Sequence, residues 1–187
     1  METRCCESQH YDRAVPGLLE PPPSPDDHVL GRPDAAHVLT MYADFECPFC
    51  QAAQSILPRV RKRLGDDLLL VFRHFPIDAR HPLARQAAYA AEAAAAQGAF
   101  WEMHDALFDL RGELGPPALL AAARRLALDV PRIEAELDAG RHHARVAADV
   151  ASGERSGVTG TPAFFAGAQP ISGSFDAGSL VDALRGR

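Results

Sequence analysis

Two cysteines separated by two residues carry the strongest chemical signal in this sequence. The segment ADFECPFCQAAQSILPRVRKRL, residues 43–64, places Cys47 and Cys50 where an extended run gives way to a helical pattern. Such a pair can bind a metal ion, form a structural disulfide, or exchange electrons as a reactive dithiol. In a reducing compartment a close cysteine pair is more often catalytic or metal-binding than structural.

The start of the helix favours the reactive interpretation of this pair. The first helical turn has unpaired N–H groups and the positive end of the macrodipole, and both stabilise a thiolate. We therefore expect the pKa of Cys47 to lie below the value of ~8.5 of a free thiol. Cys50, one turn deeper, should be less exposed, so that Cys47 would attack a disulfide and Cys50 would resolve the mixed disulfide. Pro48 suits the first helical position, and Phe49 offers an apolar contact beside the sulfur.

A zinc site is the main competing interpretation, and structural zinc needs about four Cys or His ligands. The other cysteines, Cys5 and Cys6, are adjacent in an N-terminal segment, and His142 and His143 point to different helix faces. We therefore expect no metal, and the lack of a Gly-rich phosphate loop predicts no nucleotide or other cofactor. We interpret Cys5 and Cys6 as an incidental pair, because adjacent cysteines rarely bridge, with a further redox pair or a tail anchor as alternatives.

The segment GVTGTPAFF, residues 157–165, is a second and independent signal. It places Thr161 and Pro162 after a Gly-rich turn and before a strand. X–Pro bonds are the routine source of cis peptides, which favour tight turns. A cis bond here would leave the backbone of Thr161 available to an extended substrate chain. The alternative is an ordinary trans proline at the start of a strand.

Hydrophobic periodicity predicts an α/β organisation. Strands are expected at 37–43 and 67–76, with a helix between them that Pro58 should kink. The pattern over residues 80–157 is helical throughout, and after Gly157 it predicts two short strands and a closing helix. We predict a flexible N-terminal tail over 1–27, a sheet domain over 28–79 and 158–187, and an inserted helical subdomain over 80–157.

The segments DFECPFC, FRHFPI, FWEMHDALF and GVTGTPAFFAG together resemble the DsbA-like branch of the thioredoxin-fold disulfide oxidoreductases, over about residues 28–187. The resemblance implies a thioredoxin-like fold with a helical insertion. It also implies that Cys47 is the nucleophile, Cys50 the resolving thiol, and Pro162 a cis-proline facing them beside Thr161. The implied activity is disulfide exchange with protein or peptide thiols and disulfides, with glutathione as a further candidate partner.

The family's buried acid, six positions before the first cysteine, is replaced here by Met41. Asp44 and Glu46 are the nearest acids, and either could carry protons or merely cap the local structure. Glu46 should also raise the pKa of Cys47 somewhat, because a nearby negative charge disfavours a thiolate. The missing acid keeps one alternative open, a redox-sensing binding module without turnover. A further alternative is a glutathione-dependent transferase or isomerase of the same fold. Serine usually replaces the first cysteine in the latter relatives, so Cys47 argues against it.

The bulk composition excludes several other classes of protein. The net charge of −6 gives no basic surface for nucleic acid, and no apolar run approaches the ~20 residues of a membrane span. The N-terminal sequence has no apolar core of a secretory signal, so we expect a cytoplasmic protein, or a periplasmic or extracellular one if the chain is a mature or excised fragment.

Overall fold

The structure is a computed structural model that describes residues 17–173 and 175–186, and its elements follow the predicted order. The elements within these residues are β1 (His28–Leu30), β2 (His37–Ala43), α1 (Pro48–Ala53), α2 (Leu57–Leu64), η1 (Gly65–Asp67), β3 (Leu68–His74), α3 (Ala84–Ala95), α4 (Phe100–Asp109), α5 (Pro116–Arg125), α6 (Val130–Asp138), α7 (His143–Arg155), β4 (Ala163–Ala166), β5 (Gln169–Ile171) and α8 (Ala177–Leu184).

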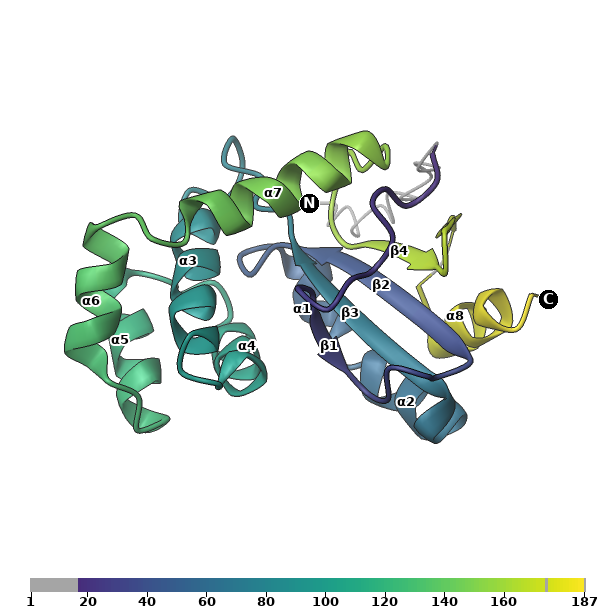
Figure 1. The fold of residues 1–187 in the computed structure, drawn as a ribbon, viewed down its shortest axis with the longest axis horizontal. Coiled ribbons are helices and arrows are strands. Elements are labelled where there is room, and N and C mark those ends of the chain that lie inside the picture. The colour runs from purple at the N-terminus through teal and green to yellow at the C-terminus, as the bar shows by residue number, and fades with distance from the viewer. Residues whose placement is uncertain (1–16, 174, 187) are drawn as a thin grey trace, which may run out of the picture.

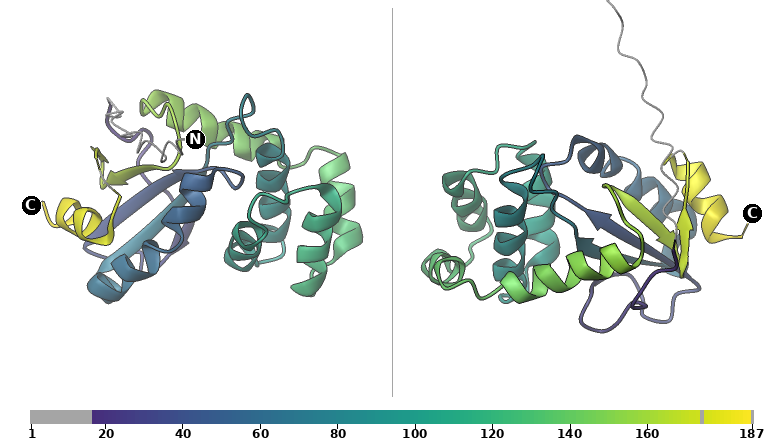
Figure 2. Two further views of the ribbon diagram at one scale, coloured as in Figure 1. Left: turned by 180° about the vertical axis from the view of Figure 1, so that it is seen from behind. Right: turned by 90° about the horizontal axis from the view of Figure 1, so that it is seen from above.

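The described strands form one mixed sheet in the order β1-β3-β2-β4-β5. β2 and β3 are parallel, and the other neighbouring pairs are antiparallel. Every residue of β3 is buried, as expected for a continuous apolar strand with both faces covered. α7 lies on one face of the sheet and α2 and α8 on the other, while α3–α6 form a block beside it (Figures 1 and 2). The predicted thioredoxin-like arrangement with added helices is confirmed.

Pro58 has a larger local effect than the predicted kink. The helix that begins after Cys47 ends at Ala53, and a new helix begins at Leu57 with Pro58 in its first turn. Between them, turn-type bonds such as Ile56 N–H to the Ala53 carbonyl, 2.9 Å, carry the backbone. Because proline lacks an amide donor, it is tolerated at a helix start and not in a helix interior. α1 is therefore a short, separate helix that carries the cysteine pair.

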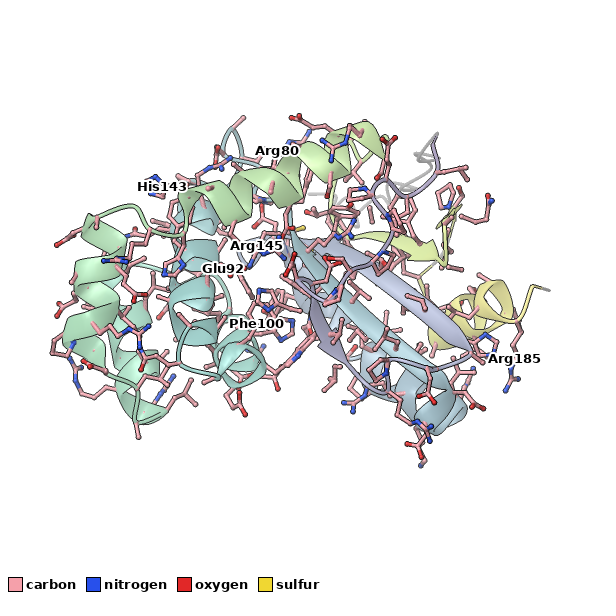
Figure 3. The ribbon with its side chains drawn as sticks, viewed as in Figure 1. Arg80, Glu92, Phe100, His143, Arg145 and Arg185 are labelled. Carbon is pink, nitrogen blue, oxygen red and sulfur yellow. The ribbon has the colours of Figure 1, made fainter. Side chains whose placement is uncertain are left out.

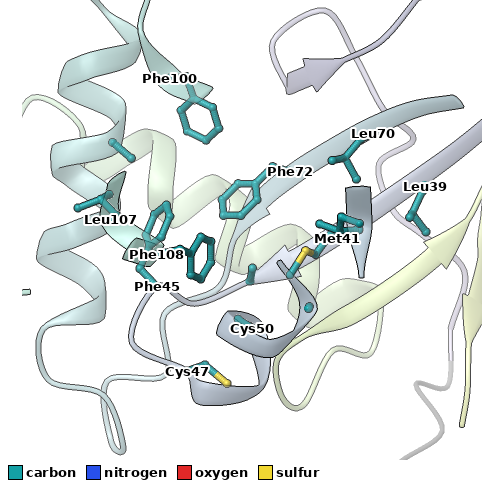
Figure 4. Packing of buried hydrophobic residues seen from close by; sticks show 14 of the residues in the cluster. Leu39, Met41, Phe45, Cys47, Cys50, Leu70, Phe72, Phe100, Leu107 and Phe108 are labelled. Atoms are coloured by element: carbon teal, nitrogen blue, oxygen red, sulfur yellow. The ribbon is translucent and has the colours of Figure 1, made fainter. Parts of the chain in front are cut away.

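One apolar core joins the sheet to the added helices, which fall in the predicted insertion. Phe45 packs against Phe72 of β3 and against Phe108 of α4, with ring centroids 5.6 and 4.9 Å apart (Figure 4). Cys47 and Cys50 border the same cluster, so the position of α1 depends on this shared packing. None of the described helices is long and apolar enough to cross a membrane.

Residues 17–27 belong to the tail expected from the sequence, yet they pack against the domain without forming a helix or strand. Leu19 is buried, and its N–H donates to the Ala168 carbonyl at 2.9 Å. Arg73 of β3 forms a buried ion pair with Asp27 at 2.7 Å and also donates to the Pro21 carbonyl. The predicted sites Cys5 and Cys6 lie outside the described residues.

Candidate active site

Cys47 occupies the boundary between the loop after β2 and α1. Its backbone is extended, with φ −73° and ψ 121°, and it takes the N-cap position with Pro48 in the first turn. The Cys47 N–H donates to the Asp44 carbonyl at 3.2 Å, which closes the loop before the helix. The residue is only 3% exposed. The predicted placement of this cysteine at a helix start is confirmed (Figure 4).

The surroundings of Cys47 lower the pKa of its thiol to about 6. The largest cause is a hydrogen bond from the Cys50 thiol, whereas burial acts in the opposite direction. The Thr161 hydroxyl and the backbone N–H groups of Cys50 and Phe49 supply further donors that stabilise the thiolate. About 90% of such a group is ionised at pH 7. Cys47 therefore carries a negative charge that hydrogen-bond donors, rather than an ion pair, hold in place.

Cys50 has the opposite character. It is fully buried, and burial raises the pKa of its thiol well above the ordinary value. The Cys47 sulfur raises it further, because a hydrogen bond and a nearby negative charge both hold the proton on Cys50. The backbone N–H of Asp44 lies 3.5 Å from the Cys50 sulfur. Both cysteines are unbridged in this structure, so the pair combines one ionised sulfur with one protonated sulfur.

The Thr161–Pro162 segment faces this pair. Its peptide bond is cis, as the resemblance to the DsbA-like branch implied. The protonated Cys47 thiol can donate to the Thr161 carbonyl, 3.3 Å away. The Thr161 hydroxyl is buried and has no hydrogen-bond partner within standard geometry among the described residues, so it can turn toward a thiolate once the thiol proton is lost. The two sequence signals, 114 positions apart, are thus brought into contact.

Two small cavities flank α1 on different faces. An apolar cavity of about 130 Å³ is lined by Phe49, Ala52, Ala53, Ile56, Pro162 and Phe175. Phe49 is 58% exposed at its edge. A second cavity of about 160 Å³ contains Cys47 itself and is lined by Phe45, Glu46, Cys47, Pro48, Gln51, Arg111 and Gly112. The protein therefore offers an apolar cavity on one side of α1 and a partly charged cavity on the other, both close to Cys47.

The carboxylates of Asp44 and Glu46 contact the loop that precedes α3. Asp44 is buried and accepts hydrogen bonds from the N–H groups of Glu46, 2.8 Å, and Ile77, 2.9 Å. Its second oxygen also lies 2.8 Å from Nδ1 of His81. Glu46 accepts from the Leu83 N–H at 2.7 Å. His81 was not singled out from the sequence, because no local pattern links it to an acid 37 positions away.

One group of side chains in the described part of the chain could hold a metal ion: His28, His74 and Glu92. Both imidazoles direct Nε2 at the same Glu92 oxygen, at 2.7 and 2.9 Å. Arg145, which pairs with Asp149, lies 3.9 Å from that oxygen (Figure 3). A cation would compete with this guanidinium, so the group is better described as an ion-pair network that joins β1, β3, α3 and α7. Cys47 and Cys50 are not part of it.

Comparison with known proteins places these features in context. The family model described as thioredoxin matches residues 23–185. A thioredoxin-like oxidoreductase from Silicibacter pomeroyi DSS-3 is 28% identical, with a TM-score of 0.78 over 87% of this chain and 92% of that one. Alpha-DsbA1 from Wolbachia pipientis is 19% identical, with a TM-score of 0.75 over 88% of this chain and 92% of that one.

A curated relative from Salinispora arenicola (strain CNS-205) is 45% identical over 166 residues and is named Na(+)/H(+) antiporter NhaA 1. The match covers 87% of this chain and 25% of the relative. The chain therefore spans about a quarter of the length of the curated relatives it matches.

Proposed function

Because the chain belongs to the thioredoxin family and resembles its DsbA-like members, we propose that it is a thiol:disulfide oxidoreductase acting on protein or peptide substrates. The observation that carries this proposal is the contrast within the pair. Cys47 has a pKa of about 6, whereas the pKa of buried Cys50 is raised. One sulfur is therefore ready to attack at neutral pH, and the other keeps its proton until it is needed.

The proposed reaction has two exchange steps. The Cys47 thiolate attacks one sulfur of a substrate disulfide, a new S–S bond forms to Cys47, and the second substrate sulfur leaves as a thiolate. Cys50 then attacks the Cys47 sulfur and releases the first substrate sulfur as a thiolate. The enzyme is left with a Cys47–Cys50 disulfide, and the substrate has gained two electrons. The same steps in reverse deliver a disulfide to a dithiol.

The first step itself prepares Cys50 for the second. The negative charge and hydrogen bond of Cys47 are among the causes that raise the pKa of Cys50. Both disappear when the Cys47 sulfur is in a mixed disulfide, because that sulfur is then neutral and a poor acceptor. The Cys50 proton still has to leave. Asp44 and Glu46 remain the proposed carriers, although their carboxylates also hold the neighbouring loop, through the Ile77 and Leu83 N–H groups.

The substrate would bind as a short extended segment beside Thr161 and Pro162. Backbone groups of an extended peptide can pair with exposed main-chain groups, and pockets for its side chains then select the sequence. The apolar cavity between Phe49 and Phe175 adjoins Pro162 and fits an apolar side chain next to the substrate cysteine. This site suits a peptide better than a large rigid ligand because it is small.

A turnover assay tests the proposal. The reduced protein should reduce a peptide disulfide repeatedly when a thiol reductant regenerates it, and Cys47→Ser should abolish the activity. Cys50→Ser should still react once, because it retains the nucleophile, but it should release product slowly. A single stoichiometric reaction by the unaltered protein, with no turnover under any reductant, would reject the enzyme proposal.

A redox-sensing module is a second candidate function. The curated relatives matched here are named Na(+)/H(+) antiporters, and the matching region makes up about a quarter of their length. A thioredoxin-family region within a longer protein could report the redox state of its surroundings through the same cysteines. Such a module would bind a partner differently in the dithiol and disulfide states, and it would show no catalytic turnover.

The direction of exchange depends on the compartment. In a reducing compartment such as the cytosol, the dithiol would be regenerated and the protein would reduce substrates. In an oxidising compartment the disulfide form would accumulate and be passed on. Equilibration with mixtures of reduced and oxidised glutathione measures the reduction potential that separates these cases.

A further inference from the structure

Arg111 lies beside the nucleophile, in the loop between α4 and α5. Its backbone has φ +49° and is followed by Gly112 at φ +90°. A non-glycine residue in this left-handed region is uncommon, and such residues occur often at functional sites. Both residues line the cavity that contains Cys47. The turn thus brings Arg111, which follows α4, to the lining of the cavity that contains the reacting sulfur.

The side chain of Arg111 is exposed to solvent. Across residues 17–173 and 175–186 no carboxylate pairs with it. Glu46 is the acid that lines the same cavity, and one of its oxygens accepts the Leu83 N–H. A guanidinium has five N–H donors and no acceptor, and it binds a carboxylate with particular strength. The cavity therefore presents donors to an anion in a chain whose net charge is −6.

The helical positions of α1 separate this cavity from the apolar one. Phe49 and Ala53 are four residues apart and share one face of α1, and this face borders the apolar cavity. Pro48 and Gln51 lie on another face and border the Arg111 cavity. A substrate that lies across Cys47 can therefore place neighbouring groups of different chemistry on the two sides.

We propose that Arg111 binds a carboxylate carried next to the reacting sulfur of the substrate, so that disulfides with such a carboxylate react preferentially. This proposal rests on the proposed oxidoreductase function. The carboxylate could belong to an acidic residue that flanks a peptide cysteine or to glutathione. Arg111 takes no part in electron or proton transfer. It raises the fraction of encounters in which the substrate disulfide is correctly placed for attack by Cys47.

Three small symmetric disulfides that differ in charge provide the test: dithiodipropionate, an anion; bis(2-hydroxyethyl) disulfide, neutral; and cystamine, a cation. The second-order rate constant for oxidation of the reduced protein is measured for each, and the selectivity is the ratio of the anionic to the neutral rate constant. Arg111→Gln should lower this ratio roughly three- to tenfold, the size of a screened attraction between unit charges about 6 Å apart. Arg111→Lys should restore part of it, and added salt should reduce it in the unaltered protein.

The matched control is Arg124→Gln, which makes the same change in net charge on α5, far from α1 in Figure 1. It should leave the ratio unchanged. An equal ratio in Arg111→Gln and the unaltered protein, or an equal loss in Arg124→Gln, would overturn the proposal. A lack of any Cys47-dependent reaction with the neutral disulfide would instead reject the oxidoreductase function itself.

Peptide disulfides with Glu or Gln beside the cysteine, and oxidised glutathione, then identify the source of the carboxylate. Preference for the Glu peptide that depends on Arg111 indicates an acidic protein substrate. Arg111-dependent reaction with oxidised glutathione indicates the tripeptide. If neither substrate responds to Arg111→Gln, the proposal fails for natural substrates.

Discussion

Removing the Cys50 thiol should raise the pKa of Cys47. The low pKa of about 6 has as its largest cause the hydrogen bond from Cys50. Hydrogen bonds to charged groups contribute about 1.5–3 kcal/mol, and one pH unit corresponds to about 1.4 kcal/mol. Cys50→Ala should therefore raise the Cys47 pKa by about one to two pH units. At pH 6 the ionised fraction would fall from about half to roughly 1–10%.

The rate of alkylation of Cys47 by iodoacetamide, measured against pH, reports this change directly. Because Cys50→Ala leaves Cys47 as the one thiol of the pair, its rate profile should follow one titration, shifted to higher pH. At pH 6 the rate should fall roughly five- to fiftyfold. Cys50→Ser retains an O–H donor, so the pKa of Cys47 in this variant should lie between its values in the unaltered protein and in Cys50→Ala. If Cys50→Ala titrates at the same pH as the unaltered protein, the hydrogen bond does not cause the low pKa.

Three further perturbations test other parts of the structure. Thr161→Val keeps the side-chain shape but removes a hydrogen-bond donor to the thiolate, so the pH dependence of alkylation should show a higher pKa for Cys47. An unchanged pH dependence would exclude the Thr161 hydroxyl as a cause of the low pKa. The folded pKa of Cys47 is depressed to about 6, so its ionisation stabilises the reduced state above the unfolded pKa, and this stability is lost as the pH falls toward 6. Urea unfolding should therefore show that the free energy of unfolding of the reduced form rises relative to that of the disulfide form between about pH 6 and pH 9. The same pH dependence in both forms would refute this. Burial alone would raise the pKa of Glu92, but the contacts with His28 and His74 outweigh it and lower the pKa. Glu92→Gln should therefore cost about 3–5 kcal/mol of stability at pH 7. The unaltered protein should lose stability as the pH falls below about 4.5, and this loss should be smaller in the variant; an equal acid dependence would contradict the assignment.

The features found from sequence are those with a local signal. Cys47 and Cys50 are three positions apart in one helical turn, and the Thr161–Pro162 step stands next to a strand, so short-range rules predict both placements. Pro58 is similar, because its missing amide acts on the adjacent turn; only the extent of the break exceeded the prediction.

The features that the sequence did not reveal depend on tertiary contacts. His81 meets Asp44, and Glu92 meets His28, only because α3 packs beside the sheet. In the sequence Arg111 has no feature that distinguishes it from other loop residues, and only the fold places it in the same cavity as Cys47. The packing of residues 17–27 was also not foreseen, since the Asp27–Arg73 pair joins a Pro-rich segment to a strand 46 positions away.

The most direct test of the central claim is to trap the mixed disulfide and locate it. Cys50→Ser is reacted with a peptide disulfide, the complex is isolated without reductant, and mass spectrometry of its fragments identifies the linked residue. The geometry predicts a peptide linked to Cys47, rapid release of that peptide by the unaltered protein, and no adduct in Cys47→Ser. An adduct on another residue, or an equal yield in Cys47→Ser, would contradict the assignment of Cys47 as the attacking sulfur.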